Sequence, residues 1–218
     1  MTISILYEDN HVLAIDKPAG MLSQGDLSGD LDVLTAVKEL LKRRDGKPGK
    51  VYLGLVHRLD RPVAGAMLLA KTSKAAGRLS RQFRERGTVK LYRAVIAGVP
   101  SADEAELVNN LEKDAATRVT RVVASGGKVA RLRYRVLGRR DAIALLEIEL
   151  LTGLPHQIRT QLAAIGCPIL GDRKYGAASH LPSGPGAIAL YSRSIAFRHP
   201  VRDEILTVEA APPPHWPW

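Results

Sequence analysis

The stretch VHRLDRPVAGAMLLAKT, residues 56–72, places a carboxylate between two arginines at the junction of two apolar runs. If residues 55–60 are extended, side chains two positions apart share a face, so Arg58 and Asp60 point the same way. A proline and a glycine soon interrupt the run, which predicts a short turn directly after the aspartate. Turns at strand ends are places where rigid scaffolds hold reactive groups. Asp60 is therefore the first candidate for a functional side chain.

The rest of the chain predicts a mixture of short strands and amphipathic helices. Strands are expected where apolar or alternating runs lie between turn residues, at 3–7, 12–15, 65–70, 89–97, 131–136 and 142–150. Residues 187–197 and 205–208 fit either closing strands or short helices. Helices are expected where apolar residues recur at helical spacing, at 31–44, 73–86 and 156–165. Asp30 and Ser73 are the expected N-caps of the first two helices.

The composition indicates a basic protein, and the length fits one large domain or a compact pair. The 218 residues include 32 Lys+Arg against 22 Asp+Glu, a formal net charge of +10. That surplus suits a polyanionic partner such as nucleic acid, although a basic protein without such a partner fits the charge equally well. The single cysteine, Cys167, excludes internal disulfides and favours a reducing compartment. Because the sequence has no apolar run of membrane length and no leader pattern, we expect a cytoplasmic protein with no membrane partner.

One strand of the second half carries a row of arginines. Arg131, Arg133 and Arg135 alternate with apolar residues, which predicts one cationic and one apolar face. The next alternating segment places Glu147 and Glu149 on its own polar face. Two interpretations are open at this point: the arginines face RNA, or they lie across from these glutamates in neutralising cross-strand pairs.

The stretch around Asp60 resembles the HRLDR signature of the RluA-type pseudouridine synthases, which isomerise a uridine already built into RNA. Three further stretches are similar to the same family in the same order: DKPAG at 16–20, KLYRA at 90–94, and GLPHQIRTQLAAIGCPILG at 153–171. One four-residue match recurs by chance, whereas four ordered blocks cover nearly the whole chain. The sequence departs from the usual pattern at Val63-Ala64, Leu154-Pro155 and Gln161.

The resemblance implies the architecture of the chain. It implies an α+β fold with a mixed, largely antiparallel central sheet, flanking helices and a basic cleft. Residues 1–218 would form a single pseudouridine synthase catalytic domain, and a monomer is expected. Because the DKPAG block begins as early as residue 16, no appended N-terminal RNA-binding module is expected. The isomerisation involves no redox change and no energy input, so no cofactor and no metal are expected.

The resemblance also implies roles for individual residues. The reaction breaks the C1'–N1 bond of uridine and makes a C1'–C5 bond, which requires a carboxylate beside C1'. This carboxylate would be Asp60, and the guanidinium that favours its ionised form would be Arg159. Arg58 would fill the space that the extracted uridine vacates, and Tyr92 would stack on the detached uracil. Further RNA contacts are expected from three basic residues of the matching blocks, Arg61, Lys17 and Lys90.

Two other functions fit part of this pattern. The first is a catalytically silent RNA-binding protein on the same fold, which would be indifferent to Asp60→Asn. The second is a nucleoside hydrolase or glycosylase, in which Asp60 would help to release the free base. Lys17 likewise has an alternative role, because it fits a residue that caps a loop as well as one that seals the cleft. The expected activity is isomerisation of a uridine in structured ribosomal or transfer RNA, and the Tyr92 hydroxyl is one candidate for the base that removes the C5 proton.

Overall fold

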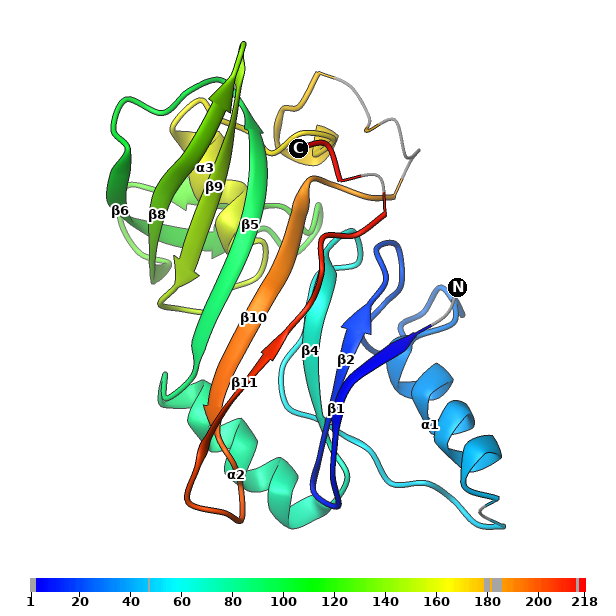
Figure 1. The fold of residues 1–218 in the computed structure, drawn as a ribbon. Coiled ribbons are helices and arrows are strands. Elements are labelled where there is room, and N and C mark those ends of the chain that lie inside the picture. The colour runs from blue at the N-terminus through cyan, green and yellow to red at the C-terminus, as the bar shows by residue number, and fades with distance from the viewer. Residues whose placement is uncertain (1–2, 47, 179–180, 182–185, 215) are drawn as a thin grey trace. The chain divides into compact units, whose positions relative to one another are not determined.

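The chain divides into two compact units, which are described separately here (Figure 1). The computed structural model describes residues 3–46, 48–178, 181, 186–214 and 216–218. The first unit comprises Met1–Thr88 and Ser192–Pro213, and the second comprises Val89–Tyr191 and Pro214–Trp218. The organisation of residues 1–218 as a single catalytic domain stays a prediction. Within the described ranges, no helix combines the length and the apolar character needed to cross a membrane.

The first unit is built on a sheet in which β1, β2, β4 and β10 are neighbours in that order. β1 pairs antiparallel with β2, and β2 with β4. β3 pairs antiparallel with the far end of β4, and β11 pairs antiparallel with β10. These strands are β1 (Ser4–Glu8), β2 (Val12–Lys17), β3 (Gly54–Leu55), β4 (Ala64–Ala70), β10 (Leu190–Arg198) and β11 (Ile205–Glu209). The two C-terminal segments are thus strands rather than short helices.

Two helices accompany this sheet, α1 (Val33–Arg44) and α2 (Ser73–Arg84). The predicted N-cap of α1 is wrong by two residues, since the carboxylate of Asp32 accepts the N–H of Thr35 at 3.0 Å. Asp30 pairs instead with Arg61 at 2.8 Å. α2 begins after Thr72, whose hydroxyl accepts the N–H of the third helical residue, so Thr72 and not Ser73 is the cap.

The core of the first unit lies between one sheet face and α2. Leu68 of β4, Leu79 of α2 and Phe197 of β10 belong to one cluster of buried apolar side chains. All seven residues of β4, AGAMLLA, are buried. Burial on both faces explains why this strand is continuously apolar rather than alternating. β4 begins four positions after Asp60, so the turn that carries the aspartate leads directly into the most buried strand.

The second unit is an antiparallel sheet with one helix. Its strands are β5 (Val89–Ala97), β6 (Glu104–Lys113), β7 (Thr120–Val123), β8 (Lys128–Arg140) and β9 (Ile143–Leu150), in the order β5-β9-β8-β6-β7. Each neighbouring pair in that order is antiparallel. The helix α3 (Gln157–Ala164) and a short 3-10 helix, η1 (Arg173–Tyr175), follow. The α+β class with a largely antiparallel sheet is therefore confirmed, while the basic cleft stays a prediction.

The proline-rich end of the chain packs onto the second unit, although its composition predicts a frayed tail. The Trp216 ring meets that of Tyr191 edge to face, with centroids 4.8 Å apart. The Arg140 guanidinium lies over the Trp218 ring, 4.4 Å from its centroid. Residue 138 is a glycine, and a Cβ there would lie 2.7 Å from Trp218. Trp216 and Trp218 therefore hold the end of the chain against the second unit through their contacts with Tyr191 and Arg140.

Candidate active site

Asp60 lies in a turn at the end of an irregular segment, not at the end of a strand. β3 ends at Leu55, so the predicted extension of this strand to residue 60 is wrong. The Ser23 side chain satisfies the backbone of Leu59 instead: its hydroxyl donates to the carbonyl at 2.7 Å and accepts the N–H at 3.1 Å. The predicted turn itself is present, since the N–H of Val63 donates to the Asp60 carbonyl at 3.0 Å.

His57 fastens the same segment to the core of the first unit. Its Nε2 accepts the backbone N–H of Leu68 at 2.9 Å, so Nε2 is the unprotonated nitrogen of a neutral ring. The ring also stacks on Phe83 of α2, with centroids 4.4 Å apart and planes 18° from parallel. The position of Asp60 is therefore tied both to β4 and to α2 through a residue three positions before it.

Lys17 is fully buried, which argues against the RNA contact expected from the sequence. Its ammonium donates to the carbonyls of Met21 at 2.7 Å, Pro18 at 3.0 Å and Arg61 at 3.2 Å. Burial lowers the pKa of Lys17 to about 7, the negative charge of Asp60 raises it, and the positive charge of Arg61 lowers it further. The side chain has no exposed surface. The Lys17 side chain links the loop after β2 to the Asp60 turn. This contact corresponds to the alternative role of Lys17 as a residue that caps a loop.

The titration of Lys17 predicts a pH-dependent stability. The folded-state pKa of about 7 lies below the ordinary value of 10.5, so the unfolded chain binds the extra proton between these values. The free energy of unfolding of the parent protein should therefore rise with pH across this window, by at most about 1.4 kcal/mol per pH unit, relative to a Lys17→Met variant. Urea denaturation of both proteins at about pH 7 and about pH 9 measures this difference. If the difference in the free energy of unfolding between the two proteins is the same at both pH values, Lys17 has its ordinary pKa in the folded protein.

The two arginines that flank Asp60 differ in their contacts. Arg61 is bound at both ends: its Nε donates to the Gly20 carbonyl at 3.0 Å, and its Nη1 pairs with Asp30 at 2.8 Å. Its backbone carbonyl also accepts the N–H of Gly20 at 2.8 Å. Arg58 is exposed and makes no ion pair with the described residues. Arg58 is thus available to an RNA ligand, whereas Arg61 already links two of the sequence blocks.

Arg159, on α3 in the second unit, is held by a buried ion pair. Its Nε donates to Asp172 Oδ2 at 2.6 Å and its Nη2 donates to Oδ1 at 2.8 Å. The two side chains are only 6% and 1% exposed. This bidentate geometry fixes the plane of the guanidinium. Nothing in the local sequence marks Asp172 as the partner of Arg159, although a buried arginine requires a carboxylate partner.

An aromatic residue supports the same guanidinium. The Arg159 guanidinium lies over the Tyr175 ring, 4.9 Å from its centroid. The Tyr175 hydroxyl accepts the N–H of Thr120 at 3.0 Å and lies 2.6 Å from Nδ1 of His156. His156 adopts a left-handed conformation, φ 54°, directly before α3. The second unit therefore orients Arg159 through residues of three separate segments.

Tyr92 and Lys90 lie on the same side of β5, as the alternation predicts. Their exposed fractions are 7% and 8%, so both are largely buried. The proposed contacts of either residue with RNA stay predictions. Within the described part of the chain, no three His, Cys, Asp or Glu side chains are grouped so that they could hold a metal ion.

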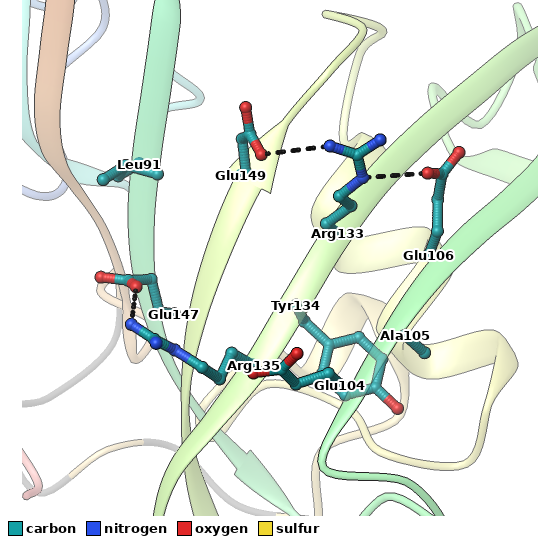
Figure 2. A pocket seen from close by; sticks show the side chains of 9 residues that line it. All are labelled: Leu91, Glu104, Ala105, Glu106, Arg133, Tyr134, Arg135, Glu147 and Glu149. Atoms are coloured by element: carbon teal, nitrogen blue, oxygen red, sulfur yellow. Dashed lines mark hydrogen bonds and ion pairs between the residues drawn. The ribbon is translucent and has the colours of Figure 1, made fainter.

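The arginine row of β8 is paired with glutamates within the second unit, and Figure 2 shows the pairs of Arg133 and Arg135. Arg135 lies opposite Glu147 with a distance of 2.8 Å between their side chains, and Arg133 lies opposite Glu149 at 3.8 Å. Glu106 of β6 accepts from Arg131 at 2.7 Å and from Arg133 at 3.0 Å, which lowers its pKa. Arg133, Arg135 and the three glutamates line an open pocket of about 440 Å³. Of the two open interpretations, cross-strand pairing is the one that the structure supports.

Comparison with known proteins places these blocks in a family. The model of the family described as RNA pseudouridylate synthase matches residues 11–164, a range that includes Asp60, Tyr92 and Arg159. An uncharacterized RNA pseudouridine synthase of Aquifex aeolicus is 34% identical over 97% of this chain and 70% of that protein. Ribosomal large subunit pseudouridine synthase C of Rickettsia conorii is 37% identical over 82% of this chain and 58% of that protein.

A solved structure agrees with the sequence matches. Human RNA pseudouridylate synthase domain containing 4 superposes with a TM-score of 0.81 at 27% identity, over 98% of this chain and 90% of that one. The four sequence blocks, the antiparallel architecture and the family match thus agree. The chain belongs to the RluA-type family of RNA pseudouridylate synthases and is an RNA pseudouridine synthase.

Proposed function

We propose that this enzyme isomerises a uridine in structured ribosomal RNA, with Asp60 as the carboxylate that acts at C1'. The observation that carries the proposal is the construction of the Asp60 turn. A fully buried lysine, Lys17, and the Ser23 hydroxyl fix the backbone on both sides of the aspartate, and Arg58 beside it is exposed. A carboxylate held on a fixed backbone next to an exposed cation is suited to an anionic ligand that must be positioned accurately.

The chemistry requires no group beyond the chain and the RNA. Asp60 attacks C1' or stabilises its developing positive charge while the C1'–N1 bond breaks. The uracil turns, C5 forms a bond with C1', C5 loses its proton, and N1 gains one, so product and substrate are isomers. A base is needed only for the C5 proton, and the Tyr92 hydroxyl is one candidate.

Arg159 and Tyr92 take the two remaining roles. A guanidinium whose plane is fixed by Asp172 can bind a carboxylate in a defined orientation, and in this proposal it aligns Asp60. The Tyr92 ring would stack on the detached uracil and retain it during the turn. Asp60 belongs to the first unit, and Arg159 and Tyr92 belong to the second.

The names of the relatives favour ribosomal RNA over transfer RNA. Several proteins at 33% to 37% identity are described as ribosomal large subunit pseudouridine synthases C or D. The buried residues that surround Asp60 carry no information about the RNA sequence. Choice of the uridine would therefore depend on RNA shape and on exposed residues such as Arg58.

Product analysis tests this proposal directly. The purified protein is incubated with large-subunit ribosomal RNA and with bulk transfer RNA, both from cells that lack the protein, and the digests are analysed for pseudouridine and free uracil. We expect pseudouridine in the ribosomal RNA and no free uracil. Pseudouridine in the transfer RNA alone would overturn the substrate, and free uracil would identify a hydrolase. RNA binding without either product would identify a silent RNA-binding protein.

A further inference from the structure

The outer face of α2 carries cations at helical spacing. Lys74, Arg81 and Arg84 are separated by seven and three positions, so they lie on one side of the helix. All three are exposed, while Ala75 and Leu79 are buried on the opposite side. We call Lys74, Arg81 and Arg84 the basic face of α2. Lys74 and Arg84 are ten residues apart, so the face extends over about 15 Å.

The charges of the basic face have no ion-pair partner within the described part of the chain. Neither Lys74 nor Arg81 nor Arg84 forms an ion pair with any of the residues that the structure describes. A face that serves solubility usually intersperses both signs. Within residues 73–86 the one acid is Glu85, which is the C-cap and makes no ion pair with the described residues. The β8 arginines, by contrast, are matched by glutamates across the strands.

α2 is fixed against the segment that ends in Asp60. Residue 54 is a glycine, and a Cβ there would lie 2.9 Å from the Cβ of Ala76, so the absence of a side chain permits this close packing. Further along the helix, Phe83 stacks on His57, three positions before the aspartate. Both contacts lie within the first unit. The basic face therefore has a fixed position relative to the Asp60 turn.

The rest of the helix surface supports this arrangement. Gln82 exchanges two hydrogen bonds with the backbone of Arg198, at 2.8 and 3.0 Å. Arg78, between the cations of the basic face, donates to the Pro200 carbonyl and thereby ties the helix to the chain after β10. Arg78 thus has a structural role, whereas the three residues of the basic face have exposed head groups without a protein partner among the described residues.

We propose that the basic face of α2 binds the phosphate backbone of the RNA whose uridine is held at Asp60. This inference rests on the proposed role of Asp60 as the site of the uridine. Phosphate groups are the anions that a row of exposed guanidinium and ammonium groups binds without reading sequence. The face would hold an RNA segment that flanks the target uridine and so set the register of the substrate.

A pair of charge-matched variants tests the basic face. Lys74→Gln/Arg81→Gln/Arg84→Gln removes three exposed charges, and Arg131→Gln/Arg133→Gln/Arg135→Gln removes three charges that are paired with glutamates. Both are made in the Asp60→Asn background, so that binding is measured without turnover. The probe is a fluorescent RNA stem-loop with a uridine-rich loop, titrated over a range of salt concentrations.

The first variant should have a shallower dependence of log affinity on log salt, by roughly two units, and about hundredfold weaker binding at about 0.1 M salt. The β8 variant should bind within about threefold of the parent, because its arginines are already neutralised. A third variant, Arg81→Lys/Arg84→Lys, keeps the charge and should keep the salt dependence. Equal weakening of the first two variants would mean a general effect of net charge and would overturn the proposal, as would no weakening of the first. Thermal unfolding confirms that each variant is folded.

Discussion

Replacement of Asp60 by asparagine is expected to reduce turnover by more than about a thousandfold while RNA affinity changes less than about fivefold. The amide cannot attack C1' or stabilise its positive charge, yet it occupies the same space in the turn. The hydrogen bond that closes this turn uses the backbone carbonyl of Asp60, which the substitution keeps. Single-turnover formation of pseudouridine and equilibrium binding of the same RNA measure the two quantities.

The neighbouring Asp30 provides a matched control for this variant. Its carboxylate pairs with Arg61, the residue that follows Asp60, and both side chains are about half exposed. Asp30→Asn removes the same charge from the same region, and an exposed pair contributes at most about 1 kcal/mol. The control should retain turnover within severalfold. Similar losses in both variants would indicate a general electrostatic effect rather than a catalytic carboxylate.

Disruption of the Arg159–Asp172 pair is expected to have the largest effect on stability. Arg159→Met leaves the carboxylate of Asp172 buried without its partner, which costs about 3 to 5 kcal/mol in the free energy of unfolding. It should also reduce turnover strongly, because it removes the guanidinium proposed for Asp60. Urea denaturation and single-turnover assays measure the two effects.

A double variant separates the two roles of Arg159. Arg159→Met/Asp172→Leu replaces both charges by apolar side chains, and replacement of a whole buried pair is often neutral for stability. The double variant should therefore regain most of the lost stability and none of the lost turnover. If it regained full turnover as well, Arg159 would have no part in catalysis, and its function would be structural alone.

Much of the secondary structure was predictable because hydrophobic periodicity is a local property. The strand expected at residues 89–97 is β5 with the same bounds, Val89–Ala97, and the arginine row forms part of β8. Two aspartates precede the first helix, and only the geometry of the backbone decides which of them is the cap. The strand predicted through residue 60 ends at Leu55. Beyond it, the backbone N–H and C=O of Leu59 bind the side chain of Ser23, which is distant in sequence, and not a neighbouring strand.

The partners of the site residues were less predictable, since they depend on contacts between distant segments. A lysine in a matching block of an RNA enzyme indicates an RNA contact, yet the ammonium of Lys17 is surrounded by three carbonyls. Asp172 lies 13 positions from Arg159 in a segment rich in charge, where nothing in the pattern marks it as buried. Glu106 of β6 also pairs with Arg133, and the sequence does not indicate this pair because strand order is not visible in the sequence.

The most direct test of the central claim is a map of pseudouridine in the total RNA of three strains: cells that lack this protein, cells restored with the intact protein, and cells restored with Asp60→Asn. The proposed function predicts that at least one ribosomal RNA position loses pseudouridine in the first strain and regains it only with the intact protein. Recovery of the same position with Asp60→Asn would contradict the role of the carboxylate. An unchanged map in all three strains would contradict the proposed activity in cells.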